Sequence, residues 1–185
     1  GVLAAGGWLW YAAEQRRAMA DYAEVLAQAY AAKTSPEARL AAIRALEVVL
    51  AQHPSAPAAS QAAYHLGDLR YDAGQYAAAR GAYEIAVAKG APPTVRSLAV
   101  AGIGQAWEAE RNFPKAIDAY QAALKTLGPR DFLYEALLVD LARAQELAGR
   151  RDDAIASYRK ILKDVPGSQR EPEVRSRLAS LGASP

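Results

Sequence analysis

One pattern occurs four times along this chain of 185 residues. In each copy an alanine is followed four positions later by a large side chain: Ala42 and Leu46, Ala79 and Tyr83, Ala116 and Tyr120, and Ala154 and Tyr158. The copies are 37, 37 and 38 residues apart. A fixed period of this length, with a small residue at one position and a large one at another, is typical of stacked helical repeats.

A second small residue recurs twelve positions before each of the last three alanines. It is Gly67, Gly104 or Ala142, and each follows a large aliphatic residue. Two helices can cross closely where a side chain is small, and an aromatic ring can fill the space beside the crossing. We therefore predict that the tyrosines of the repeat are core residues and not ligand contacts.

The composition agrees with an ordered helical protein. Hydrophobic residues make up 52% of the chain, and alanine, a strong helix former, is abundant. The formal net charge of +2 is too small to indicate nucleic-acid binding, and no basic cluster is interleaved with aromatic residues. The chain has no cysteine, which excludes disulfides, thiolate catalysis and cysteine-based zinc sites.

Proline, glycine and the apolar spacing predict the helix bounds. We expect a helix that Ser35 caps, that Pro36 opens and that ends near His53. Three helix pairs should follow at 58–73 and 76–89, 94–110 and 113–127, and 132–148 and 151–164. A last helix at 171–181 should cap the stack, since a terminal repeat otherwise exposes an apolar face. Left-handed glycines should end helices at Gly74, Gly90, Gly128 and Gly149.

The first thirteen residues, Gly1 to Ala13, are apolar and uncharged. They are too few to cross a bilayer, which needs about 20 residues. We interpret them as the second half of a transmembrane anchor helix in a longer product, with Trp8, Trp10 and Tyr11 at the membrane interface. The alternative is a buried helix that caps the solenoid. No glycine or proline interrupts residues 12–33, so the anchor should run directly into the first repeat.

Residues 62–87 resemble the tetratricopeptide repeat. Leu66-Gly67 matches the Leu-Gly pair of its first helix, and Ala79 and Tyr83 match its second helix. The resemblance extends over residues 23–166, with repeats at about 23–56, 60–93, 97–130 and 135–168. It implies an all-α fold: a right-handed solenoid of about four helix pairs, with a long N-terminal helix, in a repeat domain of residues 14–185.

The resemblance also implies a concave groove, lined by the first helix of each pair, that binds protein partners. The groove positions in this chain are Gln61, Tyr64, Asp68, Tyr71, Asp72, Leu98, Gln105, Glu108, Arg143 and Glu146. Some members of the family hold a peptide carboxylate with lysine, asparagine and arginine at these positions. Lysine and asparagine are absent here, so we predict no such clamp and a partner segment that is apolar or weakly basic.

No motif indicates catalysis or cofactor binding. His53 and His65 are isolated, which makes a metal site improbable. Gly102-Ile103-Gly104 lacks the third glycine of a dinucleotide fingerprint, and no strand precedes it. Asp152 and Asp153 fall in the first turn of a predicted helix, where acids favour the helix dipole. We therefore predict that the chain is not an enzyme and has no cofactor, no metal and no nucleic-acid partner.

One anchor helix followed by an alanine-rich repeat domain resembles a bacterial inner-membrane family described as an ancillary subunit of the Sec translocon. The resemblance implies a single-pass protein with periplasmic repeats and translocon or chaperone partners. Arg16 and Arg17 on the domain side of the anchor argue mildly against that orientation. The leading hypothesis is a membrane-tethered scaffold in translocation or envelope assembly. The alternative is a permanent structural subunit of a large membrane complex.

Overall fold

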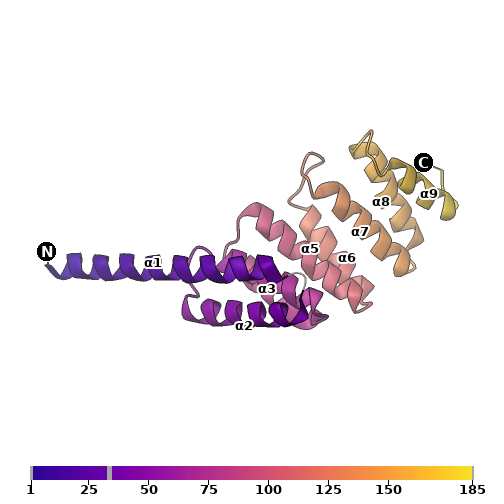
Figure 1. The fold of residues 1–185 in the computed structure, drawn as a ribbon. Coiled ribbons are helices and arrows are strands. Elements are labelled where there is room, and N and C mark those ends of the chain that lie inside the picture. The colour runs from indigo at the N-terminus through magenta and orange to yellow at the C-terminus, as the bar shows by residue number, and fades with distance from the viewer. Residues whose placement is uncertain (1, 33–34, 185) are drawn as a thin grey trace. The chain divides into compact units, whose positions relative to one another are not determined.

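The computed structural model describes the backbone of residues 2–32 and 35–184, and the side chains from residue 6 onward in these ranges. These residues form nine helices and no strand (Figure 1). The chain divides into two compact units, residues 1–99 and 100–185. The all-α repeat fold predicted from the sequence is confirmed.

The first unit contains four whole helices, and the second also contains four. The first has α1 (Val2–Ala31), α2 (Pro36–Gln52), α3 (Ala59–Asp72) and α4 (Tyr76–Ala88). The second has α6 (Phe113–Leu124), α7 (Tyr134–Leu147), α8 (Arg151–Asp164) and α9 (Glu171–Ser180). The boundary between the units falls within α5 (Pro93–Ala109).

Local sequence signals set the helix bounds much as predicted. The Ser35 hydroxyl accepts a hydrogen bond from the Ala38 N–H at 3.3 Å, and Pro36 opens α2. The largest difference is the end of α6, expected at residue 127 and found at Leu124. There the N–H groups of Thr126 and Leu127 bond three residues back, which tightens the last turn. The predicted end of the first helix, Lys33, lies outside the described residues.

Three of the four predicted left-handed glycines are confirmed. Gly74, Gly90 and Gly149 have φ of 74°, 72° and 74°. The prediction for Gly128 is wrong, because its φ is not positive. This residue lies beyond the tight turn that ends α6, and its N–H donates to the Asp131 carboxylate at 2.6 Å. The loop is therefore held by a side chain and not by a left-handed residue.

The first unit packs its helices in chain order. Helix α1 contacts both α2 and α3, α2 contacts α3, and α3 contacts α4. The core includes Tyr22, Leu46 and Leu66, which are almost completely buried. The Tyr22 hydroxyl donates to the His53 carbonyl at 2.9 Å, so the large polar group at the centre of this core is satisfied.

The second unit also packs helices that are neighbours in the chain, and it ends in a cap. Helix α7 contacts α6 and α8, and α8 contacts α9. Val174 and Leu178 of α9 are 1% and 0% exposed and pack into the core cluster of α7 and α8. The predicted capping helix is therefore confirmed.

Helix α1 runs unbroken from Val2 to Ala31. Trp8, Leu9, Trp10 and Tyr11 are 68%, 57%, 70% and 59% exposed, so this segment is not the buried cap of the alternative interpretation. Among the described residues, no helix has a stretch both long and apolar enough to span a bilayer.

Candidate functional site

The glycine of the repeat lies directly against the tyrosine. A Cβ added to Gly67 would lie 2.4 Å from the Tyr83 ring, and one added to Gly104 would lie 2.5 Å from the Tyr120 ring. Tyr83 and Tyr120 are 3% and 0% exposed. The prediction that these tyrosines belong to the core is confirmed, and the small residue is required because the ring occupies the space of its side chain.

Each repeat tyrosine also fixes a carboxylate on the first helix of its pair. The tyrosine hydroxyls donate to carboxylate oxygens at 2.9, 2.8 and 2.5 Å in the pairs Tyr83–Asp68, Tyr120–Glu108 and Tyr158–Glu146. Burial, and then the neighbouring carboxylate, raises the pKa of all three hydroxyls, which therefore remain protonated donors. Three of the predicted groove residues are thus held by the core.

The carboxylate does not occupy the same repeat position in every pair. Glu108 and Glu146 lie twelve residues before their tyrosines, whereas Asp68 lies fifteen before Tyr83. In this pair the position equivalent to Glu108 is occupied by Tyr71. An aligned repeat therefore predicts two of the three bonds and misses the one that Asp68 makes from the preceding helical turn.

Five of the predicted groove residues of the first unit lie on α3 at helical spacing, and two of them are aromatic. Tyr64, Asp68 and Tyr71 are half-buried, whereas Gln61 and Asp72 are exposed; we call these five residues the unit-1 face. Leu98, the sixth predicted residue, is half-buried on α5.

Ring contacts join this face to other side chains of the unit. The Tyr64 ring lies 5.3 Å from the His65 ring and 5.9 Å from the Tyr83 ring, between centroids. His65 Nε2 is 2.9 Å from the Tyr30 hydroxyl of α1. Tyr30 and His65 were not among the predicted groove residues, since only the fold brings α1 beside α3.

The predicted groove residues of the second unit, Gln105, Glu108, Arg143 and Glu146, form the unit-2 face. Arg143 binds Glu108 through two hydrogen bonds, of 2.7 and 3.0 Å, and pairs with Asp140 at 2.8 Å. The bonds to Glu108 raise the pKa of the Arg143 guanidinium. Burial raises the pKa of Asp140, which was not among the predicted residues. Gln105 is exposed. Arg143 therefore joins α5 to α7 and is the one cation among the carboxylates of this face.

Comparisons with known proteins agree with this architecture. One family model of the tetratricopeptide repeat matches residues 39–93 and 64–132, and a second matches residues 136–168. The first covers more than half of the chain. The chain belongs to the tetratricopeptide-repeat family. No curated protein matches it.

A solved structure is similar in fold to these tetratricopeptide repeats. It contains the nearly identical TPR-like repeats of a protein from Podosopora anserina described as a putative kinesin light chain. The TM-score is 0.67 at 17% identity, over 90% of this chain and 86% of that chain. At this identity the similarity shows the fold alone.

The described tetratricopeptide helices gather no group of three or more histidine, aspartate or glutamate side chains that could hold a metal ion. His53 lies between two carboxylates of α1, with Nε2 2.9 Å from Asp21 and Nδ1 3.4 Å from Glu14. Asp153, in the first turn of α8, pairs with Arg150 at 2.7 Å, and Asp152 is 95% exposed. His53 and Asp153 thus make ion pairs, and Asp152 is exposed to solvent. None of these three residues shows a catalytic geometry.

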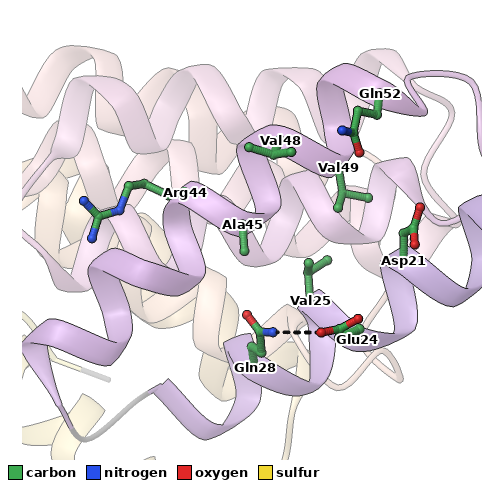
Figure 2. A pocket seen from close by; sticks show the side chains of 9 residues that line it. All are labelled: Asp21, Glu24, Val25, Gln28, Arg44, Ala45, Val48, Val49 and Gln52. Atoms are coloured by element: carbon green, nitrogen blue, oxygen red, sulfur yellow. Dashed lines mark hydrogen bonds between the residues drawn. The ribbon is translucent and has the colours of Figure 1, made fainter.

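A pocket of about 410 Å³ lies between α1 and α2 of the first unit and shares no residue with the unit-1 face (Figure 2). Its walls are Asp21, Glu24, Val25 and Gln28 of α1, and Arg44, Ala45, Val48, Val49 and Gln52 of α2. None of these residues is among the predicted groove positions, so the repeat pattern does not predict this pocket.

Proposed function

We propose that this chain is a non-catalytic scaffold that holds partner proteins at a membrane, in protein translocation or envelope assembly. Tetratricopeptide repeats bind protein segments, which supports the scaffold part of the proposal. The observation that carries it furthest is the unit-1 face, where half-buried aromatic rings lie beside exposed polar groups. Such a surface combines apolar area with hydrogen-bonding groups, as protein-binding surfaces do.

The two faces differ in what they offer a partner. On the unit-2 face, Arg143 already binds the Glu108 carboxylate and Asp140. On the unit-1 face, Gln61 and Asp72 are exposed beside the Tyr64 and Tyr71 rings. We expect the unit-1 face to provide most of the binding energy, since its rings can bury apolar area without breaking an ion pair.

The exposed start of α1 supports the tether. Trp8, Leu9, Trp10 and Tyr11 are consecutive, and each residue of a helix is rotated about 100° from the last, so they point in four directions. One partner face cannot cover all four, whereas a bilayer surrounds the helix. We infer that residues 1–13 form the second half of a membrane anchor, with Trp8, Trp10 and Tyr11 at the interface. Residue 1 itself lies outside the described residues.

The location in the cell rests on the resemblance in overall organisation. An anchor that continues into an alanine-rich repeat domain is similar to the ancillary Sec-translocon family. We therefore propose a bacterial inner membrane, with the repeats on the periplasmic side and translocon or chaperone components as partners.

Site-specific photocrosslinking tests the scaffold. A photoreactive residue replaces Gln61 or Gln105 on the predicted faces, or exposed Glu84 of α4 or Asp118 of α6 as matched controls. Crosslinking in intact membranes, followed by mass spectrometry, should capture the same proteins from the face positions and not from the controls. The Asp68→Lys, Tyr71→Ala double variant should lose these crosslinks while keeping its helical circular dichroism.

Two results would contradict the proposal. Crosslinks from the α4 and α6 positions alone would place the partner away from the predicted faces. One fixed set of subunits at unit stoichiometry, unaffected by the double variant, would indicate a permanent structural subunit instead.

A further inference from the structure

The outer side of the first helix pair carries an exposed apolar strip. In the pocket between α1 and α2, Val25, Ala45, Val48 and Val49 form the apolar centre, and Val48 is 53% exposed (Figure 2). Ala41, one turn before Ala45 on α2, is also exposed. We call this surface, with its polar rims, the α1–α2 edge.

A repeat stack buries such an edge against the next helix pair. At the other terminus of the chain, α9 covers α8 with Val174 and Leu178. No described helix of the first unit covers the α1–α2 edge, where Val48 remains exposed.

The rims of this edge carry opposite charges. Glu24 of α1 accepts only a 3.5 Å hydrogen bond from the Gln28 amide, and Figure 2 shows the Arg44 guanidinium of α2 directed away from that bond. Within residues 2–32 and 35–184, Arg44 has no ion-pair partner. Each rim therefore has a charge that its own chain does not neutralise.

We propose that the α1–α2 edge is the interface of a two-fold dimer, in which Arg44 of each copy pairs with Glu24 of the other. A two-fold interface uses one surface twice, so it must be complementary to itself. Opposite charges on the two rims of one apolar strip meet this requirement. The two copies would cover each other's Val48.

The dimer itself depends only on the edge, so it is separate from the proposed scaffold function.

Charge reversal in the full chain tests the dimer. The protein is kept in mild detergent, and light scattering measures its molar mass. We expect twice the mass of one chain for the natural sequence. Arg44→Glu or Glu24→Arg alone should weaken dimerisation by about tenfold or more, because each places like charges together at two symmetric contacts. Arg96→Glu, the same change at an exposed residue of α5, should remain dimeric.

Mixing the two self-repelling variants gives the sharpest result. The Arg44→Glu variant is acidic at both positions and the Glu24→Arg variant is basic at both. Each of the two contacts in a mixed dimer therefore joins an acid to a base, and the mixture should form heterodimers. The Arg44→Glu, Glu24→Arg double variant should dimerise alone. Circular dichroism confirms that each variant is folded.

Three results would overturn the proposal. One is that the natural sequence remains monomeric at every concentration, which would indicate that a helix of another protein covers the α1–α2 edge. Another is a dimer that all charge reversals leave intact, as association through residues 8–11 would be. The third is a mixture that does not pair although both variants are folded.

Discussion

At the scale of single residues, Gly104 of α5 lies directly against the Tyr120 ring of α6. Its absent side chain leaves room for the Tyr120 ring, 2.5 Å from where a Cβ would lie. We expect Gly104→Ala to lower the free energy of unfolding by about 1–3 kcal/mol, because the fully buried ring cannot move aside. Urea denaturation followed by circular dichroism measures this change.

Gly81 provides the matched control for that substitution. It lies in the middle of α4 with no atom within 4 Å of an added Cβ. Gly81→Ala should raise the free energy of unfolding by about 0.5–1 kcal/mol, since alanine is the better helix former. If both alanine substitutions stabilise the protein, the close contact between Gly104 and the Tyr120 ring is contradicted.

Arg111 has a φ of 60°, at the repeat position that Gly74 and Gly149 occupy with φ of 74°. A side chain in this left-handed conformation is strained, and glycine is not. Arg111→Gly should therefore raise the free energy of unfolding by about 0.5–1 kcal/mol. Thermal and urea unfolding of the variant, compared with Lys125→Gly at a position with φ of −60°, would check this. The control should lose stability.

The sequence predicts some of these residues better than others. The glycine–tyrosine contact follows from the repeat, because both residues recur at fixed spacing. The partner of Tyr83 does not follow from it. Asp68 reaches that hydroxyl from a different turn than Glu108 and Glu146 use, and only the fold shows which carboxylate is within reach.

At the scale of elements, Asp140 lies at the contact between α5 and α7. Burial raises the pKa of Asp140 above its ordinary value of 3.8, so the folded state binds this proton more tightly than the unfolded state. The contribution of Asp140 to the free energy of unfolding therefore falls as the pH rises from 3.8 through the raised pKa.

Asp140→Asn removes this contribution. We expect the free energy of unfolding of the variant, relative to the natural sequence, to increase as the pH rises from about 4 to about 6. Urea titrations across this range measure the difference. Asp152→Asn, at a side chain that is 95% exposed, should give a parallel pH profile. A relative stability of Asp140→Asn that falls with pH would contradict the raised pKa.

Leu178 holds the capping helix α9 on α8 and is 0% exposed. Leu178→Ala should lower the free energy of unfolding by about 2–5 kcal/mol, since it leaves a cavity under the cap. Amide hydrogen exchange should accelerate in α8 and α9. Leu147→Ala, at a side chain that is 52% exposed, should change stability by less than about 0.5 kcal/mol. Equal effects of the two substitutions would show that α9 does not act as a cap.

Helix bounds can be predicted here because proline, glycine and Ser35 mark them locally. The α1–α2 edge cannot be predicted in the same way. Val48 follows the same helical spacing as a core residue would, and only the packing of α1 on α2 shows that it is exposed. The Arg143 link between α5 and α7 likewise depends on which helices are neighbours.

At the scale of the whole molecule, the exposed start of α1 predicts membrane affinity. The chain should bind phospholipid vesicles, and Trp8→Ser, Trp10→Ser should bind at least about tenfold more weakly because it removes two large apolar groups. Co-sedimentation with the vesicles measures the loss. Met19→Ser, Tyr30→Ser, which removes two exposed apolar groups elsewhere on α1, should bind as the natural chain does. Equal binding by all three proteins would contradict the anchor.

The all-α repeat fold can be predicted from the sequence because its contacts are between helices that are close in the chain. The partner and the location are a different problem. The residues that recur, such as Gly67 and Tyr83, are those that pack the helices, whereas Gln61 and Asp72 on the surface do not repeat. A pattern that encodes packing says little about which protein a surface binds.

Because α1 is unbroken, the number of residues before the first unit determines how that unit is rotated about the axis of α1. No glycine or proline lies between Tyr11 and Ala18, the first of the fully packed residues, so the helix acts as a stiff rod over this stretch. Inserting one residue there would turn the unit-1 face by about 100° around the rod and move it about 1.5 Å outward. Inserting seven residues would return the unit-1 face to within about 20° of its original orientation and move it about 10 Å along the helix axis. In the proposed anchor, the length of this stretch would set both the direction in which the unit-1 face points and its distance from the membrane.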